Sequence, residues 1–441
     1  HLACRTFLYE NIDVFIELET RKTDYEYPKW SLDDIAGVAV DIGTTSVKIA
    51  LVKKSGELFL ADSFLNPQRR YGDDVISRIA AADDKTARKR LTELICRSIA
   101  SSINFMMERM QLSNEKIPCI AFSGNTTMLY LLLGLDVASL GRAPYHAPTL
   151  DFDDLGLDLG FSESVKIIML PIHSAFLGAD LVGGLAICDS RGYRKNTFFI
   201  DLGTNGEIFL RNPQGEIYAT SCAMGPALEG MTISCGMTAD DGAITHIRDE
   251  KGALVYDILG PGVPAGICGT ALIDLLSIFL KHGIINESGA MTFVDLPYPA
   301  TASEESGKKR IDLWKNITIS PNDVRQVQLA KGASLAASLQ ILNASGCRTD
   351  EIRHVIIAGS LGEYLDLNNF RRLGFIPEFP GATFTFLGNT SLMAAASACV
   401  NDDFIGNVRR LRDIIHEVTL VQDPGFQQLY LGCLSFPKGR I

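Results

Sequence analysis

Two short segments of this chain carry nearly the same residues, and both are suited to binding phosphate. One reads VAVDIGTTSVKIALV (residues 38–52) and the other reads FFIDLGTNGEIFL (residues 198–210). In each, an apolar strand leads into an Asp-apolar-Gly-Thr turn, and a second apolar strand follows. A glycine lets backbone N–H groups come close to a ligand, and successive N–H groups in such a turn form a concave site for anionic oxygens. The pair therefore predicts two phosphate-binding hairpins and nucleotide chemistry.

The polar residues of these turns suit a nucleotide with a divalent cation. Asp41 and Asp201 stand where a strand ends, and a carboxylate beside a phosphate needs a cation between the two. Mg²⁺ is the usual cation, and it is held largely through water. The turn residues that we expect to bind the phosphates are Gly43, Thr44, Thr45, Gly203, Thr204 and Asn205.

The alternative for either segment alone is an ordinary β-hairpin with an Asp-Gly turn. Two copies with matched flanking strands favour two related half-domains that face each other across a cleft. The rest of the chain alternates strand-like and helix-like segments, such as a helix expected over residues 86–111, and this alternation predicts an α/β protein. We expect the end of a different domain and a linker over residues 1–36, and a first half-domain over 37–190. A second half-domain is expected over 191–441, with C-terminal helices that return to the first.

Composition narrows the function classes. The chain has 441 residues, enough for two or three domains. Its net charge of −11 disfavours nucleic acid or an anionic membrane as a partner. Apolar runs stay short of the ~18 residues that cross a bilayer. The ten cysteines are scattered without a CxxC pair, as in a cytoplasmic protein with reduced thiols, and the seven histidines show no zinc-ligand spacing. Because the chain begins with His1, we expect a fragment or a processed chain.

Other motifs are weaker. No GxxxxGK[ST] phosphate loop occurs, and GPGVPAG (residues 260–266) lacks the full GxGxxG spacing, so we interpret it as a turn before a helix. MGPALEGMTISCGM (residues 224–237) could place a helix N-terminus at a ligand, with Glu229 on that helix, or could be a packing turn. Residues 301–313, TASEESGKKRIDL, are expected to form an exposed loop. The short basic clusters, such as Arg409-Arg410, are expected to be solvated, although one of them could face an acidic partner.

Two further motifs are near-duplicates of each other. GNTTM (residues 124–128) and GNTSLM (residues 388–393) both precede apolar helices that could approach one another at a domain hinge. The alternative is simple capping of each helix by threonine.

In order along the chain, DIGTT, GNTTM, DLGTNGE, IIAGSLG and GNTSLMAAA resemble the phosphate-1, connect-1, phosphate-2, adenosine and connect-2 elements of the acetate-kinase, sugar-kinase, heat-shock-chaperone and actin superfamily. More specifically, PIHSAFLGAD, GPALEGMTISCGM and QDPGFQQLYLGCLSFP are similar to the ATPase of reductive activators of corrinoid proteins. The resemblance covers residues 37–441. It implies an actin-like α/β fold in which two ribonuclease-H-like half-domains enclose a nucleotide cleft.

The resemblance also implies roles for individual residues. Asp41 would orient Mg²⁺ through water, and Asp201 would contact Mg²⁺ or position the attacking water. Thr204 would act with Thr44 and Thr45 on the β- and γ-phosphates. The resemblance places Gly225 and Glu229 near the ribose and the α-phosphate. It places Gly359, Ser360 and Leu361 around the adenosine. Glu207 is a further candidate for the nucleotide site.

Members of this family are similar in carrying an N-terminal ferredoxin domain with a two-iron two-sulfur cluster. Cys4 resembles the fourth cysteine ligand of that domain, but the other three are absent, so we expect this chain not to bind the cluster. We also expect the additional middle domain of some members to be missing. The resemblance implies a homodimer.

The function that the resemblance implies is ATP-dependent reduction of a partner corrinoid protein from Co(II) to Co(I), with this chain as the ATP-hydrolysing part. One alternative is a small-molecule kinase of the same superfamily. Another is a nucleotide-gated scaffold without useful hydrolysis, like actin-type assemblies.

Overall fold

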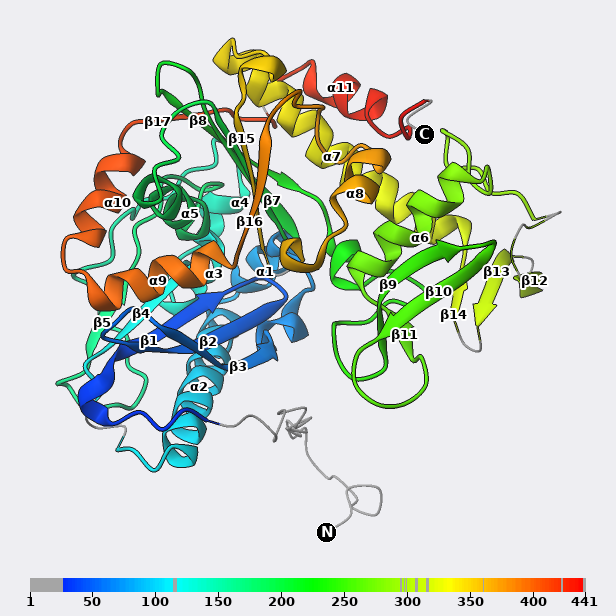
Figure 1. The fold of residues 1–441 in the computed structure, drawn as a ribbon. Coiled ribbons are helices and arrows are strands. Elements are labelled where there is room, and N and C mark those ends of the chain that lie inside the picture. Colours follow the sequence, from blue (N-terminus) through cyan, green and yellow to red (C-terminus); the bar gives the residue numbers. More distant parts are fainter. Residues whose placement is uncertain are drawn as a thin grey trace.

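The computed structural model describes residues 27–113, 117–293, 296, 298, 300–305, 308–314, 317–359, 361–421 and 423–438. Two mixed sheets form its centre (Figure 1). Cys4 and the rest of residues 1–26 lie outside the described residues, as does Ser360. The division of the chain at residues 36 and 190 stays a prediction.

The first sheet has the strand order β3-β2-β1-β4-β5. β1, β2 and β3 form an antiparallel meander, and β4 and β5 continue the sheet parallel to β1. The strands are β1 (Ile35–Ile42), β2 (Ser46–Lys53), β3 (Leu58–Leu65), β4 (Cys119–Gly124) and β5 (Lys166–Met169).

The second sheet repeats this plan, which confirms the duplicated α/β fold. Its order is β16-β15-β6-β7-β8-β17, with an antiparallel meander β6-β7-β8 and with β15 and β16 parallel to β6. β17 is an additional strand parallel to β8. The strands are β6 (Thr197–Leu202), β7 (Asn205–Arg211), β8 (Ile217–Ala223), β15 (His354–Ala358), β16 (Thr383–Gly388) and β17 (Ile415–Glu417).

Helices cover the sheets as the apolar pattern of each helix dictates. In α2, Asp84 caps the N-terminus, and Leu91, Ile95 and Ile99 recur at helical spacing and are buried. None of the helices in the described ranges has the length and apolar character that crossing a bilayer demands. The helices are α1 (Val75–Ala82), α2 (Lys85–Arg109), α3 (Thr126–Leu132), α4 (Ala138–Gly141), α5 (Ala179–Ser190), α6 (Gly269–Lys281), α7 (Pro321–Ser345), α8 (Leu367–Leu373), α9 (Thr390–Val400), α10 (Phe404–Arg412) and α11 (Phe426–Gly432).

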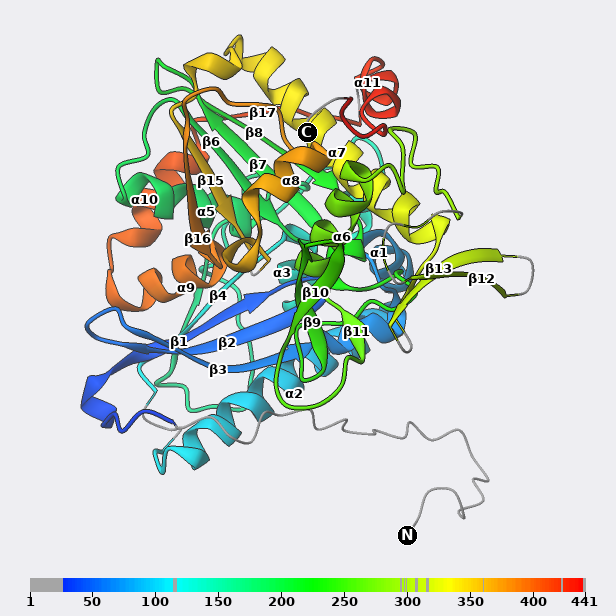
Figure 2. The ribbon, with the colours of Figure 1, turned by 45° about the vertical axis from the view of Figure 1, so that its right-hand side comes forward.

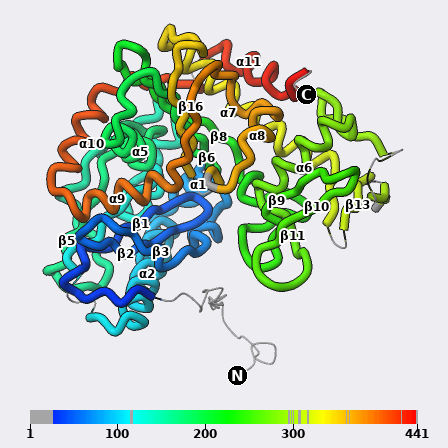
Figure 3. The backbone as a smooth tube through the Cα atoms, in the orientation of Figure 1, coloured from blue at the N-terminus to red at the C-terminus, as the bar shows by residue number. Residues whose placement is uncertain are grey.

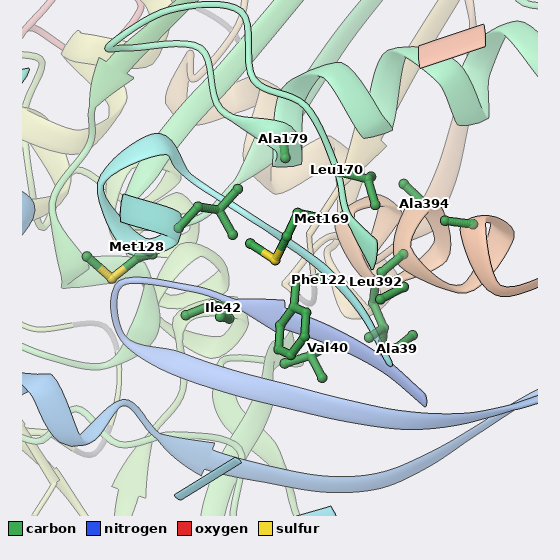
Figure 4. Close-up of a cluster of buried hydrophobic side chains, with 14 of the residues drawn as sticks. Ala39, Val40, Ile42, Phe122, Met128, Met169, Leu170, Ala179, Leu392 and Ala394 are labelled. Carbon is green, nitrogen blue, oxygen red and sulfur yellow. The ribbon is translucent and has the colours of Figure 1, made fainter. Parts of the chain in front are cut away.

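The second sheet is buried on both faces because side chains alternate along its strands. On β6, Phe199 points into a core shared with α5 and α9, whereas Phe198 and Ile200 point into a second core with α6, α7 and α8. The first core joins the two sheets. Figure 4 shows part of it, where side chains of β1, β4 and α9 gather (Ala39, Val40, Ile42, Phe122, Leu392 and Ala394).

The last part of the chain returns to the first sheet. In Figure 3 the orange tube of α9 lies beside the blue strands, and α9 packs against β1 and β4. It also packs against α5, the helix that follows β5. At the crossing, a Cβ added to Gly183 of α5 would lie 2.6 Å from the Cβ of Ala394, so glycine is needed for this close approach.

Two small sheets are inserted between β8 and β15. One contains β9 (Ala243–Glu250), β10 (Ala253–Ile258) and β11 (Gly266–Ile267), and the other contains β12 (Thr301–Glu305), β13 (Lys308–Trp314) and β14 (Ile317–Ile319). The prediction of an exposed loop over residues 301–313 is wrong, because β12 and β13 pair as an antiparallel hairpin. Figure 2 shows this hairpin projecting from the body of the protein.

Candidate nucleotide site

The two predicted phosphate turns face each other across a cleft. Gly43 and Thr44 lie between β1 and β2, and Gly203 and Thr204 lie at the corresponding turn between β6 and β7. The cleft encloses about 110 Å³. Its lining includes eleven of the predicted site residues: Asp41, Gly43, Thr44, Thr45, Asp201, Gly203, Thr204, Asn205, Glu207, Glu229 and Gly359.

A chain of hydrogen bonds crosses the cleft. The Oγ1 atoms of Thr45 and Thr204 are 2.8 Å apart, and Thr204 Oγ1 donates to Glu229 Oε2 at 2.9 Å. Both threonines are buried. Glu229 is the last residue of a short 3-10 helix, Pro226–Glu229, which begins after Gly225. Glu229 therefore lies at the second phosphate turn.

Asp41 is held in place by residues from the other half of the molecule. Its Oδ2 accepts from Asn389 Nδ2 at 2.6 Å, and its Oδ1 accepts from Ser391 Oγ at 2.7 Å. Ser391 Oγ also contacts Ser123 Oγ on β4 at 2.9 Å. Because Asn389 and Ser391 start α9, the N-terminus of this helix fixes the carboxylate of the first turn.

The cleft is rich in negative charge. Burial, together with the charges of Asp41 and Asp180, raises the pKa of Asp201 to about 7, while the Lys48 cation opposes this shift. Burial, with a contribution from Asp41, also raises the pKa of Asp180 to about 7. Burial and the charges of Asp180 and Asp201 raise the pKa of Glu207. These carboxyl groups repel one another when ionised, so a bound cation would stabilise them.

The donor set of the cleft fits Mg²⁺ held through water. Carboxylate oxygens are the ligands that Mg²⁺ prefers, and Mg²⁺ keeps several waters. In the part of the chain that the structure describes, no group of three or more His, Cys, Asp or Glu side chains has metal-site geometry. A cation in this cleft would thus be coordinated mainly by water and by phosphate oxygens. A two-iron two-sulfur cluster, which takes four cysteines, does not fit these residues.

Side chains behind the first turn hold its backbone. Asn66 Nδ2 donates to the Gly43 carbonyl at 2.8 Å, and Arg78 Nη2 donates to the Thr44 carbonyl at 2.6 Å. Asn125 Nδ2 donates to Thr44 Oγ1 at 3.0 Å. The first turn is therefore supported from three elements of its own half-domain.

Backbone groups hold the second turn. The Thr204 carbonyl accepts from the amides of Met224 and Gly225, at 3.2 and 2.9 Å. Gly225 thus lies behind the turn. Gly359 has a φ of +90°, and a Cβ there would lie 2.6 Å from the Leu202 carbonyl oxygen. Only glycine allows β15 to end so close to the second turn.

Leu361, like Gly225, does not line the cleft in the described structure. Leu361 is half-buried against the second core, and its Cδ1 lies 3.0 Å from where a Cβ on Gly269 would be.

Several cleft residues escaped the sequence prediction. Lys48 lies two residues into a strand, and Asp180 lies in PIHSAFLGAD, a motif that marked the family but received no role. Asn125 and Asn389 lie in the two GNT motifs, where threonine was considered as the cap. That alternative is wrong, because each asparagine accepts from the amide three residues on and caps its helix. The GNT motif itself was the sequence signal from which both asparagines could have been predicted.

The two helices that we expected to meet do not pack against each other. We expected the helices after GNTTM and GNTSLM, α3 and α9, to approach one another, but the helix that packs against α9 is α5. α5 follows β5, the fifth strand of the first sheet plan, just as α9 follows β16 in the second. The basic cluster at α10 is bound within the chain, because Arg409 and Arg412 both pair with Asp151.

Comparisons with known proteins agree on one family. A family model described as the C-terminal domain of RACo, the ASKHA domain, matches residues 195–441, and one described as the RACo middle region matches residues 36–191. The expectation that a middle region is missing is therefore wrong.

Individual relatives point the same way. The chain is 30% identical to the corrinoid activation enzyme RamQ of Eubacterium limosum, over 96% of this chain and 74% of that protein. It is 25% identical to the [Co(II) methylated amine-specific corrinoid protein] reductase of Methanosarcina barkeri, over 91% of this chain and 77% of that protein. The solved structure of a reductive activator for corrinoid, iron-sulfur protein superposes with a TM-score of 0.82 at 28% identity, covering 91% of this chain and 66% of that chain.

Proposed function

This chain belongs to the RACo family, and from that premise we propose that its cleft binds and hydrolyses ATP to drive the reduction of a corrinoid protein from Co(II) to Co(I). The observation that carries the proposal is the pair of phosphate turns joined by Thr45 and Thr204, with the Asp41 and Asp201 carboxyl groups beside them. Phosphoryl transfer depends mainly on such positioning and on charge stabilisation.

The proposed roles follow the geometry. N–H and hydroxyl groups of the two turns bind the β- and γ-phosphates. Asp41 orients Mg²⁺ through water, and Asp201 contacts Mg²⁺ or positions the attacking water. Glu229 orients Thr204 through their hydrogen bond, and Gly359 keeps β15 close to the second turn. When bound, Mg²⁺ supplies positive charge that offsets the charge of the phosphates and carboxylates.

ATP can do work only by binding two conformations differently. The cleft can link nucleotide binding to a change of conformation, because Asp41 of the first half accepts hydrogen bonds from Asn389 and Ser391 at the start of α9, which belongs to the second half. A nucleotide that spreads the turns would shift α9 relative to the first sheet. We propose the crossing of α5 and α9 as the place where the two halves move.

The remaining parts of the proposal concern the surroundings of this ATPase. Its partner is a corrinoid protein, it forms a homodimer, and it works in the cytoplasm. The nine described cysteines are all free thiols, as a reducing compartment would keep them. The electrons for cobalt come from an iron–sulfur domain of the whole protein, as the family resemblance implies.

The test is ATP turnover by Asp41→Ala and Asp201→Ala variants, with folding checked by thermal unfolding. We expect both to fold and to lose turnover. Full turnover in a folded Asp41→Ala variant would overturn the site. A phosphorylated metabolite formed by the wild type would instead identify a small-molecule kinase.

A further inference from the structure

Arg78 is buried, and none of the described carboxylates pairs with it. It lies on α1 with none of its side chain exposed. Its donors go to the carbonyls of Gly72 and Thr44, at 2.9 and 2.6 Å, and to Met128 Sδ at 3.2 Å. Burial lowers the pKa of Arg78 to about 10, so it stays charged at neutral pH. A buried cation is costly unless a structure uses its charge.

Arg78 lies directly behind the first phosphate turn. Together with Asn66, which is 1% exposed, it binds three consecutive carbonyl groups of that turn. Asn66 Nδ2 donates to Gly43, Arg78 Nη2 to Thr44, and the Asn66 amide to Thr45 at 2.8 Å. Neither side chain lines the cleft in the described structure.

The direction of these carbonyls fixes the direction of the amides. In a planar trans peptide, the carbonyl of one residue and the N–H of the next point opposite ways. With the Gly43 and Thr44 carbonyls turned to the buried donors, the N–H groups of Thr44 and Thr45 turn toward the cleft. Within the described residues these two N–H groups have no hydrogen-bond acceptor, so they are available to a ligand.

We propose that Arg78 and Asn66 are positioning residues of the nucleotide site, which aim the N–H groups of Thr44 and Thr45 at the phosphates and place a buried positive charge behind them. This inference rests on the proposed function. It assigns a role to residues that neither line the cleft nor touch the nucleotide. The second turn differs, because the amides of Met224 and Gly225 support its Thr204 carbonyl.

The inference predicts a loss that depends on phosphate. In Arg78→Met, we expect affinity for ATP to fall about tenfold to a hundredfold, as for a lost hydrogen bond to a charged group, while affinity for adenosine stays within about twofold. Arg78→Lys keeps the charge and should recover part of the loss. The matched control is Arg69→Met, since Arg69 pairs with Asp73 near the surface and should not affect either ligand.

The measurement is calorimetric titration of ATP, ADP and adenosine into each folded variant with Mg²⁺ present. Equal loss of all three ligands, or no loss of ATP, would overturn the positioning role. If Arg78→Met does not fold, the Asn66→Ala variant tests the positioning role, because it removes the contact with the Gly43 carbonyl and keeps the Arg78 cation. Unchanged affinity of Asn66→Ala for ATP would also overturn the role. A wild type that binds ATP no better than adenosine would overturn the proposed function as well.

Discussion

The hydroxyl oxygens of Thr45 and Thr204 lie 2.8 Å apart, although the residues are 159 positions apart in the chain. Because the Thr204 hydroxyl donates to Glu229, the hydrogen between the two threonines comes from Thr45. The two phosphate turns and the segment after β8 thus form one hydrogen-bonded chain. A γ-phosphate between the turns would replace the hydrogen bond between the two threonines. Both half-domains would then contact the phosphate, so each would respond to its binding and release.

Thr204 should therefore matter for turnover more than for folding. We expect Thr204→Val to lower ATP turnover about a hundredfold, as for the loss of one donor at a developing charge. Thr204→Ser keeps the hydroxyl and should stay close to the wild type. Steady-state phosphate release at saturating ATP measures both variants, and undiminished turnover in Thr204→Val would contradict the role.

Asn389 has two separable tasks, because it caps α9 and also binds Asp41. Asn389→Ser keeps a capping oxygen but is too short to reach Asp41, so turnover should fall while stability changes little. Asn389→Ala should lose turnover and also about 1 kcal/mol of stability from the missing cap. Urea unfolding and ATP turnover, measured on both variants, separate the two tasks. Equal turnover in wild type and Asn389→Ser would contradict the contact with Asp41.

Asp180 should make the nucleotide-free protein sensitive to pH. Its pKa rises from 3.8 to about 7 on burial, so between these values the folded protein keeps a proton that the unfolded chain has released. Stability from this group is therefore present at low pH and falls as the pH rises through that window.

The Asp180→Asn variant cannot ionise at this position, so it should not lose stability as the pH rises. In cation-free buffer, it should unfold at a higher temperature than the wild type at pH 8, and the difference should be much smaller at pH 4, near the lower end of that window. A difference of the same size at both pH values would show that ionisation of Asp180 is not the cause.

The crossing of α5 and α9 should not tolerate a methyl group. Gly183→Ala gains about 1 kcal/mol in helix propensity, but the Cβ would lie 2.6 Å from that of Ala394, and such overpacking typically costs about 1–3 kcal/mol. We expect a net loss of stability. Gly406→Ala in α10 is the matched control, because its Cβ would meet no atom within 4 Å and should stabilise. If both variants gain stability, the crossing is not tightly packed.

The sequence predicted those parts of the site that a short stretch of consecutive residues defines. Asp41 and Asp201 could be found because strand, turn and glycine stand together in each hairpin, and the repeat of that text implied the repeat of the sheet. The contact between Thr45 and Thr204 joins positions that do not correspond in the repeat, because Thr204 is the equivalent of Thr44. The duplication therefore predicts that the two turns face each other, and only the fold shows which hydroxyl groups meet.

Residues brought in by the fold could not be found in this way. Asp180 enters the cleft because α5 follows β5, and nothing near it in the sequence marks a phosphate site. Arg78 belongs to a helix of ordinary amphipathic pattern, and only its packing against the first turn gives it a task. Residues 301–313 were predicted to be a polar loop because their apolar residues are few, and only the fold shows that Ile311 and Leu313 of β13 are buried in the second core.

The most direct test of the account is ATP hydrolysis by this chain with and without a Co(II) corrinoid protein. The same corrinoid protein in its Co(I) state serves as the comparison, because an activator should respond to the state that needs reduction. We expect turnover to rise with the Co(II) form and to rise less with the Co(I) form. Turnover that no corrinoid protein changes would contradict the claim that this cleft drives corrinoid reduction.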